Sequence, residues 1–272
     1  MMSSVVGSMK KQILSIYPLF QCYRWLCRFV GNWKYHAIVK CNDLLLYEEP
    51  REVTLHRELL AIELYRSLRA SNDWMPDSLL PVAGAADYKI LYVVARLLAE
   101  YGLRDIIEFG AGQSTTLLSA FACQTDANVV TIEHDAGWTA VVASKGLPSN
   151  HRLRHCPLVE QASQSIGTCN WYDFSKSGLT ATDKFELIIV DGPVGLPRYS
   201  RVGIVDHFAN LHAPDWVVVW DDLHRIGDLQ TFALFLNRLR DDGIEHRHVI
   251  VNGMKRIGIV HTGKFDGVAS YF

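Results

Sequence analysis

Residues 105–116 read DIIEFGAGQSTT, and this stretch decides the fold. Two apolar residues run into a carboxylate, two glycines follow one residue apart, and small polar residues then begin a helical pattern. This pattern is typical of a turn from a parallel strand to a helix. The glycines have no side chains, so a ligand can contact the backbone there. The stretch therefore predicts a cofactor site of the nucleotide type at the turn.

The residues around the glycines indicate which cofactor this is. A dinucleotide fingerprint needs a third glycine three residues after the second, and Thr115 stands there instead. Glu108 at the strand end would repel a pyrophosphate, since like charges a few Å apart cost on the order of several kcal/mol at a partly buried site. The same carboxylate favours S-adenosylmethionine, which is cationic and has no phosphate. Glu133 ends the next strand pattern about 20 residues beyond the glycines, where an acid can accept from both ribose hydroxyls.

Four segments resemble, in order, successive motifs of the class I S-adenosylmethionine-dependent methyltransferases. They are Glu108-Phe-Gly-Ala-Gly-Gln-Ser-Thr, Ile132-Glu-His-Asp, Ile189-Val-Asp-Gly-Pro and Val219-Trp-Asp-Asp, and the resemblance covers roughly residues 80–262. The first three also look similar to a subgroup with plant glucuronoxylan O-methyltransferases and bacterial relatives. The resemblance implies O-methylation of a small molecule or glycan. It also implies a Rossmann-like sheet of seven mostly parallel strands that ends in an antiparallel hairpin.

The chain alternates between strand and helix patterns, which predicts an α/β fold. The strand patterns are short apolar runs, as expected for a parallel sheet that is covered on both faces. A loop is expected between the third and fourth strands, and a hairpin is expected at Asn252-Gly253. Helices are expected at 52–70, 88–101, 114–124, 136–145, 200–211 and 227–240, and strands at 105–109, 128–133, 152–157, 185–190, 215–220, 246–252 and 255–261.

The N-terminal part, residues 1–74, is expected to be a helical extension ahead of a methyltransferase-like domain over residues 75–272. Residues 1–40 contain six basic residues and no acid, and their apolar residues recur at helical spacing. This segment reads either as an amphipathic helix on an anionic membrane surface or as a helix packed on the catalytic domain. The broad apolar arc favours packing. No cleavable signal and no membrane span are expected, because the apolar stretch is interrupted by arginines.

The composition limits which binding partners and which cellular compartment we expect for this chain. The net charge of −2 provides no field that would recruit nucleic acid. The six cysteines form no Cys-x-x-Cys pair and lack the spacing of a zinc site. Cys123 and Cys156 are expected to be small buried residues in a reducing cytosol. We therefore expect a cytoplasmic protein, with peripheral membrane contact through the basic N-terminus as the alternative.

Residues at the predicted strand ends are the candidate site residues, because ligands of an open parallel sheet bind beyond the carboxyl ends of its strands. For the acids the alternative is a capping or turn role, and for the arginines it is a solvated surface. The candidates for the cofactor are Glu108, Gly110, Gly112, Ser114, Glu133 and His134. Asp191 and His224 are candidate bases, with His207 as a weaker one, and Arg198, Arg201, Arg225 and Tyr172 are candidate acceptor contacts.

Asp191, Asp221 and Asp222 are expected to converge at one rim, where three carboxylates repel one another unless something positive is present. The pattern is similar to that of the metal-dependent O-methyltransferases. This resemblance implies a Mg²⁺ or Mn²⁺ ion that makes the acceptor oxygen easier to deprotonate. Gly192-Pro193 departs from the polar residues that such sites carry. The alternative is that Asp191 faces the sulfonium or the acceptor without a metal.

Two other functions remain open at this point. One is aminopropyl transfer from decarboxylated S-adenosylmethionine on the same fold, and the other is a cofactor-binding scaffold without catalysis. An NAD-dependent oxidoreductase is disfavoured by Glu108 and Thr115.

Overall fold

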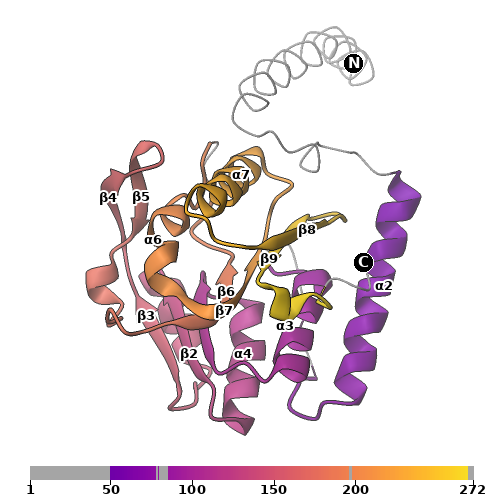
Figure 1. Ribbon diagram of the computed structural model, residues 1–272. Helices are drawn as coiled ribbons and strands as arrows, with labels where there is room; N and C mark the ends of the chain where they lie inside the picture. The colour runs from indigo at the N-terminus through magenta and orange to yellow at the C-terminus, as the bar shows by residue number, and fades with distance from the viewer. Residues whose placement is uncertain (1–49, 78, 80–84, 196–197, 269–272) are drawn as a thin grey trace, which may run out of the picture. The chain divides into compact units, whose positions relative to one another are not determined.

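The computed structural model describes residues 50–77, 79, 85–195 and 198–268 (Figure 1). Its main sheet has seven strands in the order β3-β2-β1-β6-β7-β9-β8. The parallel strands are β1 (Asp105–Phe109), β2 (Asn128–Glu133), β3 (His151–His155), β6 (Phe185–Val190) and β7 (His212–Trp220). β9 (Ile257–His261) runs antiparallel to β7, and β8 (Arg247–Val251) pairs antiparallel with β9. The predicted mostly parallel α/β sheet with a terminal antiparallel hairpin is confirmed.

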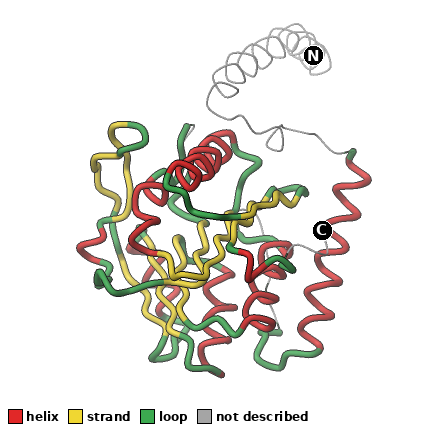
Figure 2. The backbone as a smooth tube through the Cα atoms, viewed as in Figure 1, coloured by secondary structure: helices red, strands yellow, loops and turns green. Residues whose placement is uncertain are grey.

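Helices cover both faces of this sheet (Figure 2). The described helices are α2 (Arg51–Ala70), α3 (Tyr88–Tyr101), α4 (Gln113–Gln124), α5 (Ala136–Ala143), α6 (Gly203–Leu211) and α7 (Ile226–Asp241). On one face α3 and α4 form a core with the apolar side chains of β1, β6, β7 and β9. On the other face, Phe208 of α6 and Phe235 of α7 pack against Trp216 and Trp220 of β7.

The bounds of α3 follow from its end residues. Asp87 precedes the helix and accepts from the backbone N–H groups of Lys89 (3.0 Å) and Ile90 (3.2 Å). Such a cap satisfies N–H groups that have no partner within the helix. Gly102 follows the helix with φ of +58°, the left-handed conformation that commonly ends a helix. The predicted span 88–101 is confirmed.

The expectation of a simple loop between the third and fourth strands was wrong. Residues 158–172 contain a separate two-stranded hairpin, β4 (Leu158–Ser163) and β5 (Gly167–Tyr172), which is followed by the short helix η2 (Phe174–Lys176). Figure 2 shows this hairpin at the upper left of the molecule. Most of its strand residues are exposed, and polar residues leave it without the apolar run by which the other strands were predicted. Trp171 and Tyr172 at its end are buried against Phe109.

Two smaller expectations also need correction. Asn252-Gly253 does not form a tight two-residue hairpin, because β8 ends at Val251 and β9 begins only at Ile257. Cys123 is exposed, since the buried face of α4 is made by other residues, whereas Cys156 is buried as expected.

The predictions for residues 1–40 lie outside the described residues, and the boundary between residues 74 and 75 stays a prediction. Within the described part, Tyr65 of α2 packs against Tyr88 of α3, with 5.4 Å between the ring centroids. None of the helices in that part is both long enough and apolar enough to cross a membrane.

Candidate functional site

The candidate residues gather where the strand order of the sheet reverses. From β1, the sheet continues to β2 and β3 on one side and to β6 and β7 on the other. Backbone hydrogen bonds join the strand ends: Gly110 N–H donates to Ile132 O (2.8 Å), Asp191 N–H to Phe109 O (2.9 Å) and Asp221 N–H to Val190 O (3.0 Å). Ligands of an open α/β sheet bind at such a reversal.

The glycines of the loop at residues 110–112, called the glycine loop below, serve two purposes. Gly110 has φ of +93°, and a Cβ there would lie 2.9 Å from the carbonyl carbon of Asp191. Gly112 has no described atom within 4 Å of an added Cβ. Gly110 therefore allows two strand ends to approach closely, whereas Gly112 leaves the backbone open to a ligand.

Packing also requires glycine at position 192. The metal-dependent O-methyltransferases that the sequence resembles carry a polar residue at this point. A Cβ at Gly192 would collide with Tyr172 Oη and would lie 2.8 Å from Gly110 Cα. The peptide bond between Gly192 and Pro193 is cis. No side chain fits at this position because the end of β6 passes directly against the glycine loop.

Glu108 is wholly buried beneath the glycine loop. Its Oε2 accepts from Thr115 Oγ1 (2.6 Å) and Thr131 Oγ1 (2.8 Å), and Gly112 N–H donates to Thr115 Oγ1 (2.8 Å). Burial raises the pKa of Glu108 to about 7, although the hydroxyls of Ser114, Thr115 and Thr131 lower it. The carboxyl thus supports the loop through Thr115 and is only partly ionised at neutral pH. Contact of Glu108 or of buried Ser114 with a cofactor stays a prediction.

Replacing Glu108 by Gln should stabilise the protein at alkaline pH and leave it unchanged at acid pH. The folded-state pKa of about 7 exceeds the ordinary value of 4.5, so stability is lost as the pH rises from 4.5 to 7. That difference corresponds to about 3 kcal/mol of unfolding free energy at pH 8. Urea denaturation at pH 4.5 and pH 8 measures it, with Glu160→Gln on the exposed hairpin as the control. A gain of equal size at both pH values would contradict the assignment.

Glu133 holds the glycine loop from the side of β2. Its Oε2 accepts from the backbone N–H of Ala111 (2.9 Å), and its Oε1 accepts from the N–H groups of His134 (2.7 Å) and Asp135 (2.8 Å). A carboxylate has about four lone-pair positions, so capacity remains for a further donor. The predicted ribose contact of Glu133 and the cofactor contact of His134 both stay predictions.

Trp138 is a further candidate for the site, and the sequence did not reveal it. It lies in the first turn of α5, the residue is 43% exposed, and its indole N–H donates to Ala111 O (2.7 Å). Asp135 caps α5 and accepts from the backbone N–H of Trp138 (2.7 Å), which fixes the position of the ring-bearing residue. A large exposed aromatic residue is thereby held beside the open backbone of Gly112. Its nearness to the Glu-His-Asp motif was the signal available in the sequence.

Asp191, Asp221 and Asp222, called the acid cluster below, lie together beyond β6 and β7. One carboxylate oxygen from each lies within 4.8 Å of the others. Asp221 and Asp222 are buried, whereas the Asp191 side chain is 16% exposed. Burial, and then the charge of Asp221, raise the pKa of Asp191 well above its ordinary value. Burial, and then the charge of Asp222, raise the pKa of Asp221.

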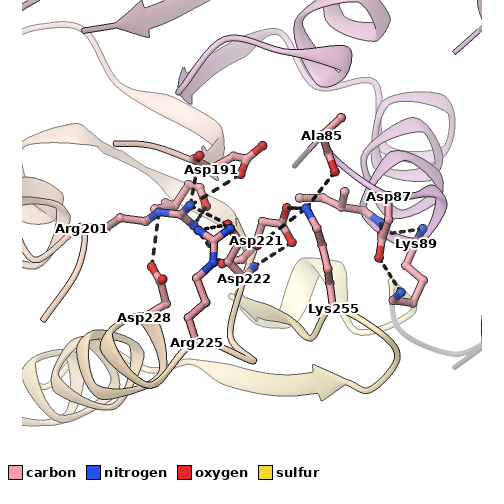
Figure 3. Close-up of polar contacts among 12 residues, drawn as sticks. Ala85, Asp87, Lys89, Asp191, Arg201, Asp221, Asp222, Arg225, Asp228 and Lys255 are labelled. Atoms are coloured by element: carbon pink, nitrogen blue, oxygen red, sulfur yellow. Dashed lines mark hydrogen bonds and ion pairs between the residues drawn. The ribbon is translucent and has the colours of Figure 1, made fainter. Parts of the chain in front are cut away.

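A buried arginine lies among these acids (Figure 3). Arg201 Nη2 donates to Asp222 Oδ2 (2.8 Å), Nη1 donates to Asp221 O (2.9 Å), and Nε lies 3.3 Å from Asp228 Oδ1. Arg201 was expected to bind an acceptor anion, yet its guanidinium is used by the protein's own carboxylates and carbonyls. Arg225 is likewise paired with Asp222, with 2.8 Å between Nη1 and Oδ2.

A lysine from the far end of the chain is the second cation of the cluster. Lys255 Nζ lies 3.3 Å from Asp221 Oδ2 and 3.6 Å from Asp222 Oδ1, and it donates to Ala85 O (2.8 Å). Figure 3 shows its side chain reaching the acids from the side opposite Arg201. Sequence patterns did not point to this residue, because it belongs to the connection between β8 and β9.

A resident divalent ion does not fit this arrangement as it is folded. The carboxylate oxygens are of the type that Mg²⁺ and Mn²⁺ prefer. However, Arg201, Arg225 and Lys255 already compensate three of the four charges carried by the acid cluster and Asp228. An ion close to Asp221 and Asp222 would be repelled by the ammonium of Lys255. The metal prediction therefore depends on displacement of Lys255.

The backbone around this cluster is strained. Tyr199, Arg201 and Asp222 have φ of +49°, +60° and +67°, which place three residues other than glycine in the left-handed region. Each costs on the order of 1 kcal/mol or more, and such residues concentrate at functional sites.

The remaining candidates contact the acid cluster in none of the described interactions. A cavity of about 220 Å³ opens between the β4–β5 hairpin and two short stretches, residues 193–194 and 198–202, and exposed Arg198 lines it. His224 is exposed in the turn before α7, and His207 packs against Phe174. Tyr172 is wholly buried, so it offers no open stacking face, and its hydroxyl has no hydrogen-bond partner among the described residues.

Comparison with known proteins finds only distant similarity, and only to solved structures. No family model and no curated protein matches the chain. A solved O-methyltransferase from Bacillus cereus, in complex with SAH, is 17% identical with a TM-score of 0.45, covering 81% of this chain and 94% of that one. A precorrin-6y C5,15-methyltransferase from Geobacter metallireducens is 13% identical with a TM-score of 0.41, covering 70% and 95%. A methyltransferase from Pyrococcus furiosus is 12% identical with a TM-score of 0.39, covering 75% and 97%.

Proposed function

We propose that this chain is a class I S-adenosylmethionine-dependent methyltransferase that methylates an oxygen of a small molecule or glycan. The main support is the placement of the glycine loop and the acid cluster at the reversal point of a sheet ordered β3-β2-β1-β6-β7-β9-β8. The antiparallel pair at the end of this sheet is the ending that the methyltransferase resemblance implies, and an ordinary dinucleotide-binding domain lacks it.

In this proposal the adenosine of the cofactor lies against the open backbone of Gly112. Trp138 provides an aromatic surface there, and Glu133 accepts from a ribose hydroxyl with its remaining lone pair. The glycine loop contacts Asp191 through Gly110, so a sulfonium beyond the loop would face the acid cluster. Four carboxylates face three cations there, and the one negative charge left over is our reason for preferring a cationic cofactor, in place of the Glu108 contact expected from the sequence.

The reaction needs alignment and removal of one proton. The acceptor oxygen forms a bond to the methyl carbon, the carbon–sulfur bond breaks, and the sulfonium becomes a neutral thioether. The acceptor hydroxyl proton passes to a base, and Asp191 is our assignment. It is the most exposed carboxyl of the cluster, and its raised pKa makes it a stronger base than an ordinary aspartate. His224 is the second candidate.

The acceptor is proposed to enter from the cavity beside Pro193. Its volume of about 220 Å³ is below the range of about 300–1,000 Å³ for drug-sized ligands, so it suits a small acceptor or one ring of a larger one. Arg198 on its wall would pair with an acidic group on that acceptor. A cytoplasmic location and membrane contact through residues 1–40 remain proposals.

Calorimetry and methyl transfer together test this function. We expect S-adenosylmethionine to bind and NAD⁺ not to bind, and we expect labelled methyl to pass into a metabolite or glycan extract. EDTA should not reduce turnover, because cations of the chain already lie among the acids of the cluster. If EDTA abolishes turnover and Mg²⁺ or Mn²⁺ restores it, the metal prediction is supported. Turnover of decarboxylated cofactor with putrescine would indicate aminopropyl transfer, and binding without any transfer would indicate a scaffold. NAD⁺ binding in place of S-adenosylmethionine would refute the assignment.

A further inference from the structure

The connection between β8 and β9 carries Lys255 into the acid cluster and is held on both sides of it. On one side, Met254 N–H donates to Glu58 Oε1 of α2 (2.8 Å). On the other side, Leu223 N–H donates to Arg256 O (2.8 Å), which joins this connection to the turn that follows Asp222. Lys255 is therefore fixed beside the acids by its neighbours in the chain as well as by its charge.

The ammonium of Lys255 lies where an ion bound by the cluster would need to make its contacts. It is 3.3 Å from Asp221 Oδ2 and 3.6 Å from Asp222 Oδ1, and its side chain is only 15% exposed. Asp222 Oδ1 is buried and has no hydrogen-bond partner among the described residues. Asp222 Oδ1 therefore faces the ammonium of Lys255 but accepts no hydrogen bond from it. A metal ion coordinated by this oxygen would satisfy it better than an ammonium 3.6 Å away.

We propose that Lys255 is a built-in replacement for a divalent ion, and that its ammonium blocks a metal site which the acid cluster would otherwise form. Lysine is a compact point charge, so it neutralises carboxylates without binding an acceptor oxygen as a metal does. The cluster binds no divalent ion while Lys255 is present, and it binds one when the ammonium is removed. Ion binding by the acid cluster does not require methyl transfer, so either proposal can fail without the other.

Mn²⁺ titration of the full chain, followed by electron paramagnetic resonance of the free ion, tests the proposal. Wild type should show no Mn²⁺ site at the acid cluster. Lys255→Met keeps the aliphatic stem and should gain one site with affinity at least tenfold above any binding by wild type. Adding Asp221→Asn to Lys255→Met should abolish the gained site. Lys255→Arg keeps the positive charge and should behave as wild type.

Lys264→Met is the matched control, because it removes a lysine whose carboxylate neighbours, Glu186 and Asp215, are both 3.9 Å away and outside the cluster. It should gain no Mn²⁺ site. If Lys255→Met does not fold, Lys255→Gln retains a donor for Ala85 O and answers the same question. Equal Mn²⁺ binding by wild type and Lys255→Met would overturn the proposal, and so would a folded Lys255→Met or Lys255→Gln that binds no Mn²⁺.

Discussion

Replacing Arg201 by Met is expected to lower the free energy of unfolding by about 3–5 kcal/mol, the usual cost of removing one partner from a buried ion pair. The guanidinium is almost wholly buried and bonds to Asp222 while lying 3.3 Å from Asp228. It also donates to the carbonyl oxygens of Val190, Pro193, Asp191 and Asp221. Its loss would leave buried carboxylates uncompensated and the ends of β6 and β7 without a shared donor.

The size of this effect should depend on pH. Burial raises the pKa of Asp228 to about 6 even though Arg201 lowers it, and loss of the arginine would raise that pKa further. A carboxyl with a raised folded-state pKa stabilises the protein at low pH and loses that contribution as the pH rises. The cost of Arg201→Met should therefore be smaller at pH 5 than at pH 8.

Urea denaturation at the two pH values measures this. Arg198→Met, which removes an exposed arginine from the same segment, is the control and should change the free energy of unfolding by less than about 0.5 kcal/mol. Arg201→Lys should lie between the two, because lysine keeps the charge and loses the planar fork of donors. An Arg201→Met protein as stable as Arg198→Met would show that the guanidinium does not hold the cluster together.

The parts of the fold that the sequence predicted well are those in which local pattern and burial agree. β1, β2 and β6 have the predicted bounds, because each contains a run of buried apolar residues, as expected for a strand that is covered on both faces. The β4–β5 hairpin was not predicted, because its strands lack such a run of buried apolar residues. Most of its strand residues are exposed, and its large buried side chains are Trp171 and Tyr172 at its end.

The acidic residues of the candidate site could be predicted from the sequence, whereas its cationic residues could not. Asp191, Asp221 and Asp222 end strands, so the sheet alone brings them to one edge. Arg201 resembled a surface arginine because arginine is seldom fully buried, and only tertiary structure shows the acids that pair with it. Lys255 reaches the cluster because β9 lies between β7 and β8, a pairing that its neighbouring residues do not reveal.

Glu108 shows how much depends on the side of the sheet that a residue faces. Its position at a strand end was clear from the sequence, and its chemistry suggested contact with a cationic ligand. Side chains alternate along a strand, so Glu108 and Phe109 point to opposite faces. Phe109 packs on Trp171, whereas Glu108 lies under the start of α4 with Thr115. The alternation was visible in the sequence, but which face carries α4 was not.

The two glycines of the glycine loop should respond to alanine in opposite ways. Gly110→Ala places a Cβ 2.9 Å from the backbone of Asp191 and requires φ of +93°, which alanine rarely adopts. Steric overlap and backbone strain together should cost about 3 kcal/mol or more of unfolding free energy. Gly112→Ala meets no described atom within 4 Å and has φ of −171°, an extended value open to any residue. Its unfolding free energy should change by less than about 1 kcal/mol.

Calorimetry separates packing from ligand contact at this loop. If the cofactor lies against Gly112, Gly112→Ala should keep wild-type stability and lose at least tenfold in affinity for S-adenosylmethionine, because the added methyl occupies the ligand's space. Trp138→Ala offers an independent check, since loss of the aromatic surface should weaken binding while Gly112 stays unchanged. A Gly112→Ala protein that folds and binds S-adenosylmethionine with undiminished affinity would mean that the open backbone is not where the cofactor lies, and the proposed cofactor position would have to be abandoned.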